Sequence, residues 1–273
     1  MLRSMLRRSV NCIPGQMRPW IRHIPGLALG QRWLVTNILN GGPFLHVINS
    51  GPARGLRFEI TLPEDKAIWA GTFESQVSRL LQEAVRRGDV CYDIGGYRGY
   101  MAGVMAVAGA ARVIIFEPFN ENVLSLERFA QLNPKLRLQI EALAIMDREG
   151  EVSFHIMPDP SMGKMADSPY EVGRASVGTT MVRVCTLDAC IFERGLPRPN
   201  FIKVDVEGAE HSVLKGGQRT LAECRPILLL EAHSAKLADL CVRTLKRHAY
   251  DVQQLEQGQV DPDAPRHLMA RPR

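Results

Sequence analysis

The segment formed by residues 90–99, VCYDIGGYRG, constrains the fold of this chain more than any other. Its first three residues predict a short buried strand that ends at Asp93. Gly95 and Gly96 follow, and because neither has a side chain they allow a sharp turn in which the backbone approaches a ligand closely. Asp93 then lies where a hydroxyl or amine of a nucleotide-like ligand would sit.

A helix and a second acidic strand end follow this turn. Gly99 would let the helix predicted over 100–108 pack tightly on the sheet. The β-rich run over 112–118, RVIIFEP, places Glu117 at its end, about twenty residues after Asp93. An acid at this position is suited to hold ribose hydroxyls, so the pair of motifs predicts a nucleotide-like ligand at the ends of two neighbouring strands.

The rest of the chain alternates between strand and helix patterns. Apolar residues at helical spacing predict helices over 74–87, 120–133 and 235–248, the second capped by Asn120, and Thr186 is expected to cap a short helix. Alternating or apolar runs predict strands over 56–62, 136–142, 152–156, 182–185, 201–204, 227–230, 250–255 and 267–270. Residues 152–156 are expected in a hairpin, and the helix after Gly208 is expected to be interrupted near Gly216.

This order predicts a doubly wound α/β fold, with a mostly parallel sheet of about seven strands covered by helices on both faces. A chain of 273 residues suits one such domain, which we expect over residues 56–273. Residues 157–180 are rich in Gly, Pro, Ser and Met without a period. We expect this long segment to form a mobile cover over the substrate.

Residues 1–55 are expected to form an irregular basic extension. Residues 1–58 contain eight arginines and neither lysine nor acidic residues, whereas the remaining 26 basic and 29 acidic residues sum to −3. Because the basic residues cluster in this arm, nucleic acid is not an expected partner. A solvated or self-docked arm is favoured; peripheral contact with an anionic membrane and a mitochondrial-type presequence are the alternatives.

The six cysteines are scattered without a C-x-x-C pair, which favours reduced, buried thiols in a cytoplasmic protein. Residues 1–22 contain no apolar stretch long enough for a signal peptide or a membrane span. The sequence does not indicate an oligomeric state.

Acidic residues follow two further strands of the predicted sheet. Residues 205–210, DVEGAE, come after one strand, and residues 231–233, EAH, end the next. The carboxyl ends of parallel strands meet at one edge of such a sheet, where ligands bind. An acid before the first glycine would repel a pyrophosphate, so Asp93 favours a ligand with an amino-acid end.

The chain resembles the FkbM family of S-adenosylmethionine-dependent methyltransferases. The resemblance covers roughly residues 56–256 and depends on five runs, the last being the most specific: 71–74, 90–99, 116–122, 186–188 and 202–210 followed by 213–216. It implies a class I methyltransferase (Rossmann-like) fold with seven strands, the last antiparallel. It also implies S-adenosyl-L-methionine as the cofactor and methyl transfer to an oxygen atom of a hydroxylated small molecule, such as a sugar, a glycolipid headgroup or a secondary metabolite.

The resemblance assigns residues to the two halves of the cofactor. Asp93 and the backbone of Gly95 and Gly96 would hold the methionine portion, and Glu117 the ribose. The other cofactor-binding residues that we expect are Tyr97, Gly99, Pro118, Asn120, Ala142, Leu143 and Asp205, with Asn120, Ala142 and Leu143 beside the adenine and Asp205 at the boundary with the acceptor. Tyr97 stands where the family usually has Asn, and Arg98 replaces an apolar residue. We expect Tyr97 to close over the ligand, and a catalytically decayed binding protein is an alternative.

Glu207 and His233 are the candidate catalytic residues, because an alcohol acceptor must lose its proton to a positioned base. The structural alternatives are that Glu207 and Glu210 cap the following helix and that His233 is a satisfied histidine at a strand end. Asp205 and Glu207 are two residues apart, but the sequence offers no third ligand, so no metal site is predicted. A nicotinamide-dependent oxidoreductase on the same sheet is the other alternative, against which Asp93 argues.

Overall fold

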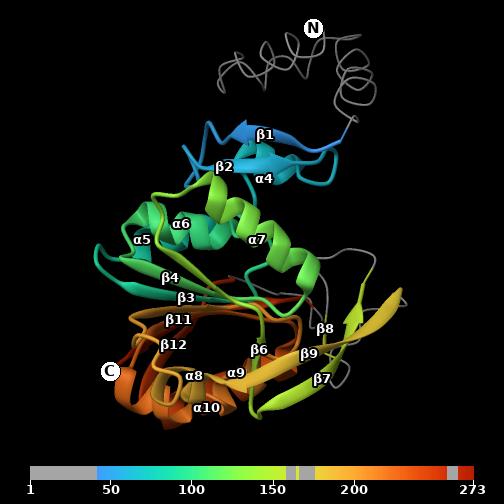
Figure 1. Cartoon of the computed structure of the whole chain (residues 1–273). Helices are drawn as coiled ribbons and strands as arrows, with labels where there is room; N and C mark the ends of the chain where they lie inside the picture. The colour runs from blue at the N-terminus through green and yellow to red at the C-terminus, as the bar shows by residue number, and fades with distance from the viewer. Residues whose placement is uncertain (1–41, 158–163, 166–175, 257–263) are drawn as a thin grey trace, which may run out of the picture. The chain divides into compact units, whose positions relative to one another are not determined.

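The computed structural model describes residues 42–157, 164–165, 176–256 and 264–273, and Figure 1 shows its ribbon. The chain divides into two compact units between Leu80 and Leu81, within helix α5 (Ser75–Ala84). The expected domain boundary at residue 56 stays a prediction. The roles expected for the basic arm fall largely on residues 1–41, which lie outside the described part of the chain.

The N-terminal unit is small. Strands β1 (Phe44–Val47) and β2 (Arg57–Ile60) pair antiparallel, and helix α4 (Lys66–Ala70) follows them. Alternate residues of β2, Phe58 and Ile60, are buried, as the period of a half-buried strand requires.

A seven-stranded sheet forms the centre of the second unit, in the order β12-β13-β11-β10-β3-β4-β5. Its strands are β3 (Val90–Ile94), β4 (Arg112–Phe116), β5 (Leu138–Glu141), β10 (Phe201–Val204), β11 (Ile227–Ala232), β12 (Tyr250–Gln254) and β13 (Arg266–Pro272). Neighbouring strands from β5 to β11 run parallel, while β13 is antiparallel to both β11 and β12. The predicted fold class, including the antiparallel last strand, is confirmed.

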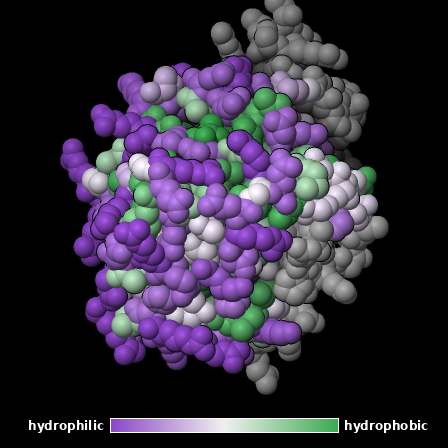
Figure 2. All heavy atoms as spheres, turned by 60° about the horizontal axis from the view of Figure 1, so that its bottom comes forward, coloured by the Kyte–Doolittle hydropathy of each residue, from purple (hydrophilic) through white to green (hydrophobic). Residues whose placement is uncertain are grey.

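Helices cover both faces of this sheet (Figure 1). One face carries α6 (Tyr100–Ala108) and α7 (Asn120–Leu132); the other carries α8 (Leu187–Phe192), α9 (Glu210–Lys215) and α10 (Ala235–Arg247). The strands between them are apolar because both of their faces are buried. Helix α10 buries Leu237, Cys241 and Leu245 in this core. Figure 2 shows that the outer surface on this side is mostly hydrophilic.

A second sheet, in the order β6-β9-β7-β8, is inserted between β5 and β10. It contains β6 (Ala144–Met146), β7 (Gly150–Ile156), β8 (Lys164–Met165) and β9 (Gly178–Thr186). Val152 and Phe154 alternate inward, and Phe119 stacks on Phe154 with ring centroids 6.0 Å apart. The expected strand at 152–156 pairs with β9 as well as β8.

The expectation that residues 157–180 lack regular structure was therefore wrong in part, because two strand segments lie within them: the whole of β8 and the start of β9. The role of this segment as a cover over the substrate concerns mostly residues 158–163 and 166–175, which are not among the described residues.

Three local expectations have clear outcomes. The Thr186 hydroxyl accepts a hydrogen bond from the Ala189 N–H at 3.0 Å, so its capping role is confirmed. Asn120 was wrongly expected to cap α7: the N-cap is Phe119, without a side-chain cap, and Asn120 is the first helical residue. The helix after Gly208 ends at Lys215 as expected and resumes as a π-helical turn, Thr220–Cys224.

Among the described residues, no helix is both long and apolar enough to cross a membrane.

Backbone hydrogen bonds join the ends of three central strands. The Gly95 and Gly96 N–H groups donate to the Phe116 carbonyl at the end of β4, and the Asp205 N–H donates to the Ile94 carbonyl at the end of β3. Gly95 has a φ of 90°, and a Cβ built on it would lie 1.7 Å from the Asp205 carbonyl oxygen. Glycine is required here because β3 and the segment after β10 touch through their backbones.

We therefore expect Gly95→Ala to lower the free energy of unfolding by more than about 2 kcal/mol, because left-handed strain and a backbone clash add. Gly88→Ala is the matched control: Gly88 has a similar φ of 96°, and its Cβ would meet nothing within 4 Å. Urea unfolding of both variants measures the difference. Equal losses of stability would show that the close approach of the two strand ends does not constrain the fold.

Candidate functional site

The predicted site residues gather where the sheet changes direction. From β3 the chain adds β4 and β5 on one side, then returns to add β10 and β11 on the other. Asp93 lies within β3, Glu117 follows β4, Asp205 follows β10 and His233 follows β11. The carboxyl ends of neighbouring parallel strands at such a switch point form the ligand-binding edge of doubly wound sheets.

Asp93 is a completely buried carboxylate with one cation beside it. Its side chain is 0% exposed, neither oxygen has a hydrogen-bond partner, and the Lys203 ammonium lies 3.8 Å from Oδ1. Burial raises the pKa of Asp93 to about 6, although the charge of Lys203 opposes the shift. Two buried oxygens that accept no hydrogen bond suit a ligand that brings an ammonium or hydroxyl.

Glu117 is held by the glycine-rich turn itself. Its two oxygens accept hydrogen bonds from the Tyr97 N–H at 2.9 Å and the Phe119 N–H at 3.0 Å. Burial nevertheless raises the pKa of Glu117 to about 7, because these backbone bonds only partly offset desolvation. Tyr97, with a φ of 45°, therefore links the turn after Asp93 to Glu117, and the two acids belong to one connected edge.

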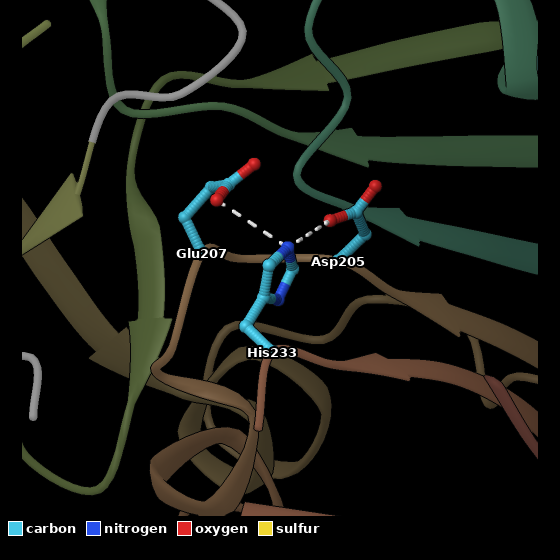
Figure 3. A group of neighbouring side chains, drawn as sticks. All are labelled: Asp205, Glu207 and His233. Atoms are coloured by element: carbon cyan, nitrogen blue, oxygen red, sulfur yellow. Dashed lines mark ion pairs between the residues drawn. The ribbon is translucent and has the colours of Figure 1, made fainter. Parts of the chain in front are cut away.

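Asp205, Glu207 and His233 converge on one point from two strand ends (Figure 3). The Nε2 atom of His233 lies 3.3 Å from Glu207 Oε2 and 3.7 Å from Asp205 Oδ1. Glu207 has a φ of 51°, so a non-glycine residue occupies the left-handed region there, which costs about 1 kcal/mol or more. The sequence offered no third ligand beside Asp205 and Glu207. The structure places His233 in that position.

A buried carboxylate orients the His233 ring. Glu210 Oε1 lies 2.8 Å from His233 Nδ1 and also accepts the Gly208 N–H at 2.8 Å. Burial disfavours the charged imidazole, but the bonds with Glu207 and Glu210 outweigh it and raise the pKa of His233 to about 12. Without a bound ion or ligand, His233 is therefore an imidazolium, which cannot accept a proton. Glu207 is the better candidate base.

Asp205 joins the two halves of the edge. Its Oδ2 accepts from Lys203 at 3.1 Å while its Oδ1 faces His233. Burial opposes its ionisation, but the charges of Lys203 and His233 outweigh this and hold the pKa of Asp205 below its ordinary value. Lys203 thus bridges Asp93 and Asp205, and the candidate cofactor and acceptor sides share one network.

The remaining predicted cofactor-binding residues differ in how deeply they are buried. Leu143 is buried in the main core, whereas Ala142 and Asn120 are exposed and Pro118 is half-buried. A Cβ on Gly99 would lie 2.7 Å from the Phe129 ring of α7, and one on Gly96 would lie 2.1 Å from Ile115. These two glycines therefore serve packing within the protein, and the contacts expected beside adenine stay predictions.

Two groups that matter here were missed in the sequence. Lys203 lies in a buried apolar strand, and a lysine there is a signal because lysines are seldom buried without a partner. Glu210 was considered only as a helix cap, and it both accepts the Gly208 N–H and contacts His233. The pairing of β11 with β13 also brings His267 opposite Glu231, at 3.3 Å. The bond with Glu231 raises the pKa of His267 to about 9, which favours its charged form.

The model of the methyltransferase FkbM domain matches residues 93–256, more than half of the chain. The chain belongs to this family. The methyltransferase expected from the motifs is confirmed, and the nicotinamide-dependent alternative is not favoured.

A curated relative of this FkbM methyltransferase is the hexuronic acid methyltransferase AglP of Haloferax volcanii. The two are 28% identical over 161 residues, which cover 59% of this chain and 63% of AglP. This chain therefore matches somewhat less than two thirds of that relative's length.

Two solved structures are similar to this chain, and the first shares its fold. A transferase from Pyrococcus horikoshii, PH0793, has a TM-score of 0.50 at 12% identity and covers 93% of this chain and 84% of its own. An FkbM methyltransferase from Methylobacillus flagellatus is 20% identical with a TM-score of 0.45, covering 76% and 54%.

The buried network predicts a pH-dependent cost for removing Lys203. We expect Lys203→Met to lower the free energy of unfolding by about 3 kcal/mol at pH 8, since Asp93 and Asp205 lose their shared cation. The folded-state pKa of Asp93 is raised, so the folded protein binds its proton more tightly than the unfolded chain does. The destabilisation should therefore shrink as the pH falls to 5.

Urea unfolding at the two pH values measures this difference, with Lys246→Met as the control because Lys246 is an exposed lysine of α10. A loss that is the same at both pH values would show that Lys203 does not offset a buried carboxylate.

Proposed function

We propose that this methyltransferase uses S-adenosyl-L-methionine and methylates a hydroxyl oxygen of a small molecule, with a hexuronic sugar as the favoured class of acceptor. The observation that carries the proposal is the joining of two buried acids at one sheet edge: Asp93, with Lys203 at 3.8 Å, and Glu117, bound to the backbone of the turn between them. The relative that acts on hexuronic acid supports the sugar class.

The residues present fit this cofactor. Asp93 offers two acceptor oxygens to an ammonium, and Glu117 has lone-pair capacity for a ribose hydroxyl beyond its bonds with Tyr97, Phe119 and Asn122. When bound, S-adenosylmethionine supplies a methyl group already activated by the sulfonium. The protein therefore has mainly to align the acceptor oxygen and remove its proton.

Glu207 is the group that we assign to this proton. It lies past the end of β10, its side chain is 18% exposed, and its Oε2 faces His233. His233 acts as a positioning residue, because its ring is fixed between Glu210 and the two acids. Asp205 lies between the Glu207–His233 pair and Asp93, and its side chain accepts a hydrogen bond from Lys203.

The cysteines bear on the cellular compartment of the protein. All five cysteines among the described residues are free and four are buried, which supports the cytoplasmic placement expected from the sequence. The acceptor is a small molecule, with nucleic acid not expected.

Cofactor binding tests the first half of the proposal. Glu117→Ala should weaken the binding of S-adenosylhomocysteine by at least about tenfold, because ribose hydroxyls lose a carboxylate partner. Calorimetric titration measures it, with Glu121→Ala as the control, since Glu121 is exposed in the first turn of α7. In the unaltered protein the affinity should also fall as the pH drops below about 7, where Glu117 takes up a proton. Unchanged affinity in Glu117→Ala would refute the ribose assignment.

Turnover tests the second half. In an assay of methyl transfer to free and glycosidically linked hexuronic acids, Glu207→Gln should lower kcat at least about 100-fold while the affinity for S-adenosylhomocysteine stays within about twofold. Glu223→Gln, an exposed surface glutamate, is the control. A normal kcat in Glu207→Gln would remove Glu207 from the reaction.

A further inference from the structure

Asp205, Glu207 and His233 have the arrangement of ligands around a metal ion. Their ligand atoms all lie within 4.8 Å of one another, and the two distances from His233 Nε2 are 3.3 and 3.7 Å. Two ligands bound to one divalent ion at about 2.0–2.2 Å lie roughly 3.0–3.5 Å apart. Small side-chain adjustments would therefore bring all three atoms around one ion (Figure 3).

The groups around these three residues are those that support metal ligands. Glu210, completely buried, contacts His233 Nδ1 at 2.8 Å and can hold the proton on that nitrogen, so that an ion displaces the proton of Nε2 and binds the nitrogen facing the two acids. Metal-bound histidines almost always donate the N–H of their second nitrogen to a carboxylate, a backbone carbonyl or water, and Glu210 is such a carboxylate. Lys203 engages Asp205 Oδ2, which leaves Oδ1 as a single ligand atom.

Buried charge and buried acceptors point independently to a cation. In the part of the chain that the structure describes, Lys203 and His233 contact a group of four carboxylates: Asp93, Asp205, Glu207 and Glu210. Both oxygens of Asp93 and Oε2 of Glu210 are also buried without a hydrogen-bond partner. Gathering so many carboxylates in a buried region is costly, and a bound cation would lower that cost.

We propose that Asp205, Glu207 and His233 bind one divalent transition-metal ion, with Mn²⁺ as the representative metal, and that the ion holds the hydroxyl oxygens of the methyl acceptor. Mixed carboxylate and imidazole ligands suit Mn²⁺, and three protein ligands leave open positions for a substrate. The role toward the acceptor rests on the proposed function, whereas the metal site itself does not.

The ion would act on the acceptor in two ways. It fixes the oxygen in position, and it lowers the pKa of a bound hydroxyl so that the proton leaves more readily. The O–H bond then breaks with its proton passing to the Glu207 oxygen that does not hold the ion, the acceptor oxygen forms a bond to the methyl carbon, and the bond from that carbon to sulfur breaks with its electrons remaining on sulfur. In this arrangement Glu207 holds the ion with Oε2 and accepts the proton with its other oxygen, so Glu207→Gln would lower turnover through both roles.

Titration of Mn²⁺ into the full-length, EDTA-treated protein tests the site directly. The electron paramagnetic resonance signal of free Mn²⁺ should show one ion bound per chain. Asp205→Asn and Glu207→Gln should each raise the Kd at least about tenfold, and Glu210→Gln about tenfold or more through His233. His248→Gln and Glu223→Gln are matched controls, since these residues lie in exposed or partly exposed surface contacts. Thermal unfolding confirms that each variant is folded.

Absence of Mn²⁺ binding at millimolar concentration, or a Kd that is the same in folded Asp205→Asn and Glu207→Gln as in the unaltered protein, would overturn the metal site. S-adenosylhomocysteine binding measured without Mn²⁺ separates this result from the proposed function. If that ligand binds and Mn²⁺ does not, only the metal inference fails; if Mn²⁺ binds and that ligand does not, only the cofactor proposal fails.

Discussion

The backbone contact between Gly95 and Asp205 is the constraint on which the candidate site depends. It brings the turn after β3 against the segment after β10, and the Phe116 carbonyl ties the same turn to β4. Three strand ends are thereby held without any side chain between them. The side chains of these segments are then free to point into a common region, which is how Asp93, Glu117 and Asp205 become neighbours along one edge.

The chemistry of this edge follows from burying more acids than cations. Lys203 is shared by two carboxylates, and His233 is surrounded by three. In water such groups would interact weakly, but away from solvent each unbalanced charge changes the protonation of its neighbours. Burial raises the pKa values of Asp93 and Glu117, whereas the charges of Lys203 and His233 hold the pKa of Asp205 below its ordinary value, so the excess of acids is only partly offset. A positively charged ligand or ion at this edge would relieve it.

Sequence patterns predicted an element correctly where a single hydrophobic period or a single motif determines it. The apolar runs over the central strands, the cap at Thr186 and the break near Gly216 depend on neighbours close in sequence. Asn120 shows the opposite case: a good capping residue lies inside the helix because Phe119, which packs against Phe154 of the second sheet, occupies the cap position. A tertiary contact overrode the local preference there.

The sequence by itself determined the class of fold, the position of the acidic strand ends and the family, because strand period, glycine turns and motif spacing are local properties. Only the tertiary structure decided that Glu210 orients His233, that Lys203 joins Asp93 to Asp205, and that residues 144–186 contribute a separate sheet. His233 is 28 residues from Asp205 in the sequence, and hydrophobic periodicity does not indicate that the two side chains lie 3.7 Å apart. Contacts of this kind arise from strand order, and the strand order is set by how the whole chain buries its apolar surface.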